Sequence, residues 1–199
     1  MKKSTLTWIV VIGAIVLIGA WMAKGYNAMV VEQENVENAW GQVEASYQHR
    51  ADLVPSLAKT VEAAVKGEKA EYTAVMEARA KATQMVIDPS NMTEEQLRNF
   101  NQVQGELTQA LNRLMVVAEA YPELTATQQF TDLRAQLEGV ANRITVARKE
   151  FNNCAQVYNT LIRRFPNNIV ASIFGFTKRP YFEAEEGAEK APDLNFNFD

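Results

Sequence analysis

The stretch ATQQFTDLRAQLEGVANRITVARKEFNNCAQVYNTLIRRF, residues 126–165, carries the pattern that decides the fold. Its apolar side chains recur at intervals that alternate between three and four residues. One row is Phe130, Leu137, Ile144, Phe151, Tyr158 and Phe165, and the other is Leu133, Val140, Ala147, Cys154 and Leu161. A sustained period of 3.5 residues is typical of helices that pack side by side. The stretch therefore predicts one helix about 60 Å long with a continuous apolar face.

Three earlier segments show the same helical periodicity, at 26–66, 68–87 and 93–121. The last helix is expected over 125–165, and short connections make neighbouring helices antiparallel. We find neither an alternating strand pattern nor an internal repeat. The sequence thus predicts an all-α fold in which an N-terminal transmembrane helix precedes an elongated, antiparallel (up-and-down) four-helix bundle. A short C-terminal helix and an extended tail complete it.

Local signals mark where these helices begin and bend. Thr93 with Gln96 and Thr125 with Gln128 match the capping box that starts a helix. Pro55 lies inside the first predicted bundle helix. This proline either kinks a single helix or separates two, and we favour the kink.

The chain opens MKKSTLTWIVVIGAIVLIGAWMAKGYN, and the run over residues 4–23 carries no charge. A helix of that length spans about 30 Å, which matches a bilayer core, whereas a secretion signal has an apolar region of about 7–15 residues. Trp8 and Trp21 lie near its two ends, where aromatic rings favour lipid headgroups. We expect residues 1–25 to be a retained anchor; a signal cleaved after Gly25 is the alternative.

Charge and composition limit the function of the remaining residues. The chain has net charge −4, and its first 24 residues hold three lysines and no acidic residue, so the body is acidic. An acidic body is a poor general binder of nucleic acid or anionic lipid. One histidine, His49, and one cysteine, Cys154, cannot form a zinc set, and Ser46 stands where a Glu-x-x-His di-iron motif needs a glutamate. We predict no catalytic, cofactor or metal site and no small-molecule substrate.

Arginines near the predicted seams are candidate structural residues. Arg50 falls on a seam position and Asp52 is close to it in sequence. A buried pair between them would fix helix register rather than perform chemistry. Arg79 and Arg148 are interpreted as similar partners between helices. The other candidates are an aromatic and proline set, namely Trp40, Pro55, Tyr158, Phe174, Phe176 and Phe182.

Asparagines follow aromatic residues at Asn27, Asn152 and Asn159. Their amides would either cross-link helices or stay in water.

The two C-terminal segments differ in character. Residues 166–182 are aromatic and locally basic, and three chain reversals should bring them back near the bilayer surface. They would lie in the headgroup layer or fold against the end of the bundle. Residues 183–199 are acidic and end in alternating apolar side chains, which suits an extended docking peptide. A disordered tail is the alternative.

Motifs along nearly the whole chain resemble the LemA family of bacterial membrane-anchored proteins. They include Tyr26-Asn27, Ala39-Trp40, HRADLVPSL at 49–57, YPEL from residue 121, ITVARKEFN at 144–152, Tyr158-Asn159, Phe165-Pro166 and Tyr181-Phe182. The resemblance implies an up-and-down helical bundle beside an N-terminal anchor, with no established catalytic activity. Some members of the family are associated with membrane shaping or with membrane quality-control proteases.

The lysines around the apolar run indicate its orientation. Lys2 and Lys3 precede the run and only Lys24 follows it closely, so the positive-inside rule favours a cytoplasmic N-terminus. With the family resemblance, this predicts a single-pass protein of the bacterial inner (cell) membrane whose body is periplasmic. The family is also described with its N-terminus outside, so a cytoplasmic body is the alternative.

Three functions follow from these features. The favoured one is a non-enzymatic scaffold that forms homo-oligomers or organises membrane and envelope proteins. Its argument is that a seam of about 60 Å offers more apolar face than two shorter helices can cover, and uncovered apolar faces mark interaction sites. The second is an adaptor for a membrane enzyme or quality-control protease. The third is an enzyme, which would need a cavity lined by Arg50, Asp52 and Arg148.

Overall fold

The computed structural model describes residues 3–65 and 69–183, and all its regular elements there are helical. They are α1 (Lys3–Ala64), α2 (Lys69–Gln84), the 3-10 helix η1 (Pro89–Asn91), α3 (Glu94–Glu119), α4 (Pro122–Thr125), α5 (Gln128–Arg163) and α6 (Asn167–Phe174). The prediction of an all-α fold with a short C-terminal helix is confirmed for these residues. The expectations for residues 184–199 lie outside the described chain.

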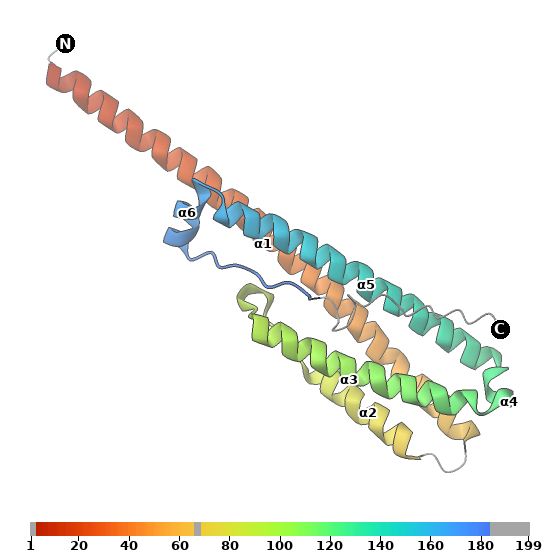
Figure 1. The fold of residues 1–199 in the computed structure, drawn as a ribbon. Helices are drawn as coiled ribbons and strands as arrows, with labels where there is room; N and C mark the ends of the chain where they lie inside the picture. Colours follow the sequence, from red (N-terminus) through yellow and green to blue (C-terminus); the bar gives the residue numbers. More distant parts are fainter. Residues whose placement is uncertain (1–2, 66–68, 184–199) are drawn as a thin grey trace, which may run out of the picture.

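Helix α1 is continuous from the apolar run to the far end of the body (Figure 1). Its 62 residues correspond to a length of about 93 Å. Its N-terminal part is long and apolar enough to cross a membrane, with a mean hydropathy of 1.9. Pro55 lies inside α1, so the chain forms one helix across this proline rather than two.

The other long helices pack along the body of α1 (Figure 1). Helix α5 runs back beside α1 toward the apolar run. Of the helices, α5 makes the most extensive contact with α1. Helices α2 and α3 form a hairpin, and both contact α1. Because α2 and α3 are shorter than α5, they do not cover the end of the α1–α5 pair that is nearest to the apolar run. Other elements pack there.

Those other elements cover the apolar face of α5. The buried residues of this helix are Phe130, Leu133, Val140, Ile144, Ala147, Phe151, Ala155, Tyr158, Asn159 and Ile162. Val170 and Ala171 of α6 and Phe182 join Phe151, Tyr158 and Ile162 in one buried cluster, to which Leu97 and Phe100 of α3 also belong. The expectation of a long uncovered seam on α5 is therefore wrong, because the chain after α5 folds back onto it.

The helix caps show one correct and one wrong prediction. Thr93 Oγ1 accepts a hydrogen bond from Gln96 N at 3.1 Å, and Gln96 Oε1 accepts one from Thr93 N at 2.9 Å, as the capping box predicts. The cap of α5 is Thr127, whose Oγ1 accepts from Phe130 N at 3.3 Å. The prediction of Thr125 is wrong because Pro122 starts a separate short helix, α4, that ends at Thr125.

Candidate interaction site

Residues 176–183, here called the C-terminal segment, follow α6 without regular secondary structure. Gly175 ends α6 with a φ of 76°, the left-handed conformation that a glycine adopts without a Cβ penalty. In Figure 1 the segment, in blue, runs back from α6 along the α1–α5 pair. The chain reversal at Gly175 thus places this segment against helices far away in sequence.

Two asparagines of α5 hold the backbone of the C-terminal segment. Asn159 Nδ2 donates to Arg179 O at 2.8 Å, while Asn159 Oδ1 accepts from Arg179 N at 2.8 Å. Asn152 makes the same pair of bonds with Phe182, at 2.9 and 2.8 Å. A carboxamide carries a donor and an acceptor like a peptide group, so each asparagine pairs with the segment as a neighbouring strand would. We call these two asparagines and the segment the asparagine clamp.

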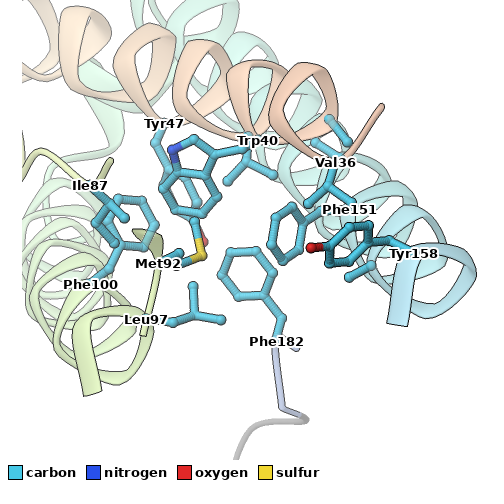
Figure 2. Packing of buried hydrophobic residues seen from close by; sticks show 14 of the residues in the cluster. Val36, Trp40, Tyr47, Ile87, Met92, Leu97, Phe100, Phe151, Tyr158 and Phe182 are labelled. Atoms are coloured by element: carbon cyan, nitrogen blue, oxygen red, sulfur yellow. The ribbon is translucent and has the colours of Figure 1, made fainter. Parts of the chain in front are cut away.

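The asparagine clamp places Phe182 in the cluster of buried aromatic side chains around Trp40, which is shown in Figure 2. The centre of its ring lies 6.0 Å from that of Trp40, and the two ring planes are inclined by 16°, so the rings stack. The centre of the Phe151 ring lies 5.4 Å away in an edge-on arrangement. Trp40, which is 1% exposed, also contacts Phe100 of α3 at 5.2 Å. One indole therefore connects α1, α3, α5 and the C-terminal segment.

Two arginines accompany the clamp. Arg179 is 3% exposed, lies 5.6 Å from the centre of the Tyr158 ring, and approaches Glu37 at 4.0 Å. Arg148 lies over the Phe182 ring at 4.7 Å and donates to Glu183 O at 3.2 Å. Burial raises the pKa of the Tyr158 hydroxyl, so this residue is neutral beside the guanidinium. Arg148 thus joins α5 to the C-terminal segment and not to another helix, and Arg179 is a buried arginine that sequence reasoning missed.

Arg50 connects α1 to α3. Its Nη1 donates to Thr108 Oγ1 at 2.8 Å, and its Nη2 donates to Gln104 Oε1 at 2.7 Å and to Gln104 O at 3.1 Å. Asp52 instead accepts from Gln48 of its own helix at 2.8 Å. The expected Arg50–Asp52 pair is therefore wrong. Residues two apart on a helix do not face each other, and α3 offers Arg50 two polar partners.

Arg79 of α2 compensates for Pro55 of α1. A proline has no N–H, so Pro55 leaves the carbonyl four residues earlier, that of Ala51, without its helical donor. Arg79 Nε donates to this oxygen at 2.7 Å. Two residues that the sequence marked separately, Pro55 and Arg79, thus form one feature that fixes α2 against α1.

Replacing Arg79 by methionine should lower the free energy of unfolding by about 1–3 kcal/mol, because the Ala51 carbonyl loses its donor. Pro55→Ala supplies the missing backbone N–H and should remove most of that cost. Urea unfolding of the two single variants and the double variant in mild detergent, followed by circular dichroism, measures the coupling. An equal cost of Arg79→Met with and without Pro55 would show that the bond contributes nothing specific.

Phe174 and Phe176 gather around Tyr26 of α1. Their ring centres lie 4.9 and 5.6 Å from that of Tyr26. Tyr26 lies three residues after the end of the apolar run, so these rings pack close to that end of α1.

The described residues do not bring the proposed catalytic set together. Arg50 binds α3, Asp52 is exposed, and Arg148 binds the C-terminal segment. In residues 3–65 and 69–183, no group of three or more His, Cys, Asp or Glu side chains is placed to hold a metal ion. A cavity of about 240 Å³ lies between α3 and the C-terminal segment, lined by Glu94, Leu97, Arg98, Asn101, Lys178, Tyr181 and Glu183.

The LemA family model matches residues 39–196, which include Trp40, both clamp asparagines and the C-terminal segment. The chain belongs to the LemA family. The matched part of this LemA-family chain contains both asparagines of the clamp and the whole C-terminal segment, whereas Tyr26 and Glu37, which contact this segment, lie before the matched residues.

Three curated proteins resemble part of this LemA-family chain. They are magnetosome proteins MamQ 1 and MamQ 2 of Paramagnetospirillum magneticum and magnetosome protein MamQ of Magnetospirillum gryphiswaldense. Each is 32% identical over 85 residues, which are 43% of this chain and 31% of the relative. The match therefore spans less than a third of the length of these relatives.

Proposed function

We propose that this LemA-family chain is a non-enzymatic, membrane-anchored helical scaffold that self-assembles and organises membrane or envelope proteins. The observation that carries this proposal is the continuity of α1. The same helix contains the apolar run and the first long helix of the body, with no linker between them. From residue 23 to Ala64 it extends about 60 Å, so it holds the body as a stiff projection from the bilayer.

The packing roles of the charged and aromatic residues support a structural rather than a catalytic function. Arg50, Arg79 and Arg148 each hold separate parts of the chain together. We assign the same role to the remaining candidates, Trp40, Pro55, Tyr158, Phe174, Phe176 and Phe182, and give Asp52 a surface role. We further propose that α1, α2, α3 and α5 act as one up-and-down four-helix bundle. Its support is a second apolar cluster to which all four contribute.

We place the anchor in the bacterial inner membrane, with the N-terminus in the cytoplasm and the body in the periplasm. The lysines before the apolar run support this orientation. The three MamQ relatives are named as magnetosome proteins, which supports a membrane-associated role.

Self-assembly needs outward apolar side chains, and α1 and α5 each carry one near the anchor. Val31 of α1 is 57% exposed and Val157 of α5 is 53% exposed. We propose that these parts of α1 and α5 meet between protomers.

The test is the particle mass of the full chain in lipid nanodiscs extracted without detergent. We expect a discrete multimer, and Val157→Glu should reduce it because the interface would bury an unpaired charge. Val116→Glu on α3 is the matched control. Val116 is 67% exposed and belongs to the last turn of α3, and the C-terminal end of this helix lies far from the anchor in Figure 1. Monomers in the unsubstituted protein would contradict self-assembly.

The second candidate function is an adaptor for a membrane enzyme or quality-control protease. The asparagine clamp favours it, because the clamp fixes Phe182 at the end of the described chain, directly before the acidic stretch in the sequence. Monomeric particles that carry a partner protein, and lose it when residues 184–199 are deleted, would favour the adaptor over the scaffold.

A further inference from the structure

Helix α6 is held against α1 at the end of the apolar run. Gly25 is buried there, and a Cβ added to it would lie 3.5 Å from Asn167 Oδ1 and 3.6 Å from Val170 Cγ2. Both distances are ordinary van der Waals separations, so α6 packs directly against α1 at Gly25. Trp21 and Met22 are partly buried against the cluster that contains Val170 and Ala171.

This contact fixes the depth of α6 relative to a bilayer. The uncharged run ends at residue 23, so Gly25 lies about 3 Å beyond it along the helix. The headgroup layer on each side of a bilayer is about 5–8 Å thick. Because α1 continues without a break, α6 lies at the level of that layer when α1 crosses the membrane.

The faces of α6 differ in chemistry. Val170 and Ala171 are buried against the body. Ile169 and Ile173 are 47% and 60% exposed and lie one turn apart on the same flank. Asn168 and Ser172 are exposed on a second outer flank, about 100° around the helix axis from the isoleucines. Phe165, just before α6, is 77% exposed. The helix thus shows an apolar outer flank, a polar outer flank and a buried face.

The charge around α6 is entirely positive in sequence. No acidic residue occurs between Glu150 and Glu183. Arg163, Arg164 and Lys178 are exposed on either side of the helix. Basic residues beside an apolar flank are typical of segments that lie on anionic lipid. Acidic residues do occur on the neighbouring part of α1, at Glu32, Glu34 and Glu37, so the positive charge is local to α6 and the residues that flank it.

We propose that α6 is a second membrane contact, in which Ile169, Ile173 and Phe165 insert into the headgroup layer of the bilayer that α1 crosses. Arg163, Arg164 and Lys178 bind the phosphates of anionic phospholipids at that surface. A single helix can tilt and rotate in a bilayer, and a second contact beside it restricts both motions. The lipid-bound α6 therefore sets the angle at which the body projects from the membrane.

The experiment places one fluorescent label on each outer flank of α6 in the full chain. With Cys154→Ala as background, Ile173→Cys and Ser172→Cys are labelled with an environment-sensitive dye and inserted in phosphatidylglycerol nanodiscs. Lipids brominated near the glycerol end of the acyl chain serve as quenchers. We expect quenching at 173 about twofold or more stronger than at 172, since these neighbours lie on different flanks. Circular dichroism verifies that both variants keep their helices.

Two results would overturn the proposal. The first is equal quenching at the two positions, or none. The second is a label at 173 that is quenched neither by the brominated lipids nor by iodide in the water. That result would mean that a second copy of the chain covers this flank. Replacing phosphatidylglycerol by phosphatidylcholine should weaken the quenching at 173. Unchanged quenching would show that anionic headgroups are not recognised.

Discussion

Replacing Trp40 by alanine should lower the free energy of unfolding of the body by about 3–5 kcal/mol. The indole is 1% exposed and packs against Phe100, Phe151 and Phe182, which come from three different parts of the chain. Its removal leaves a cavity that no single helix can close by shifting. Urea unfolding of the full chain in mild detergent, followed by circular dichroism, measures the change.

Two other variants make this result specific. Trp40→Phe keeps an aromatic ring in the cluster and should cost less than half as much as alanine. Trp8→Ala removes the same side chain from the apolar run, where Trp8 is 67% exposed, and should leave the unfolding of the body unchanged. A cost for Trp40→Ala below about 1 kcal/mol would mean that the cluster rearranges freely, contrary to the close packing expected of a core.

The helices and their buried faces were predictable from local pattern. A residue on a helix returns to the same face after three or four positions, so the apolar spacing of residues 126–165 identifies the buried face of α5 without knowledge of its neighbours. Trp40 and Tyr158 were found for the same reason, and both are fully buried. The capping box of Thr93 is equally local, since its bonds join residues three apart.

Contacts between distant segments were not predictable in this way. Arg50 has polar partners 54 and 58 residues away on α3, and nothing near it in sequence identifies them. The α5 cap was misplaced because Pro122 competes with it by starting α4. The error on the partner of Arg50 and the error on the α5 cap have a common cause. In each case the outcome depends on residues outside the helix concerned, and the apolar periodicity of that helix does not reveal them.

The two asparagines of the clamp could have been identified from the sequence. Asn152 and Asn159 are seven residues apart, which is two helical turns, and each follows an aromatic seam residue. That spacing places both amides on one face beside the core, where solvated side chains are unusual. Their partner could not be inferred, because backbone groups of any extended segment satisfy an amide equally well.

The asparagine clamp yields the last prediction, on Asn159. Asn159→Ala should leave the buried N–H and C=O of Arg179 without partners, at a cost of about 1–3 kcal/mol for each group. The C-terminal segment should then open without unfolding the helices, since it holds no regular structure of its own. We expect hydrogen exchange in residues 176–183 to accelerate by about tenfold or more, as a loss of 1.4 kcal/mol implies.

The control for this prediction lies on the same helix. Asn153 is exposed, so Asn153→Ala removes the same side chain six residues away from Asn159 and should leave exchange in residues 176–183 unchanged. Asn159→Asp keeps the acceptor for the Arg179 N–H but turns a carboxylate oxygen toward the Arg179 carbonyl, so it should also open the segment. Equal exchange in Asn159→Ala and Asn153→Ala would mean that Phe182 packing alone holds the C-terminal segment. The two asparagines would then only select its register against α5.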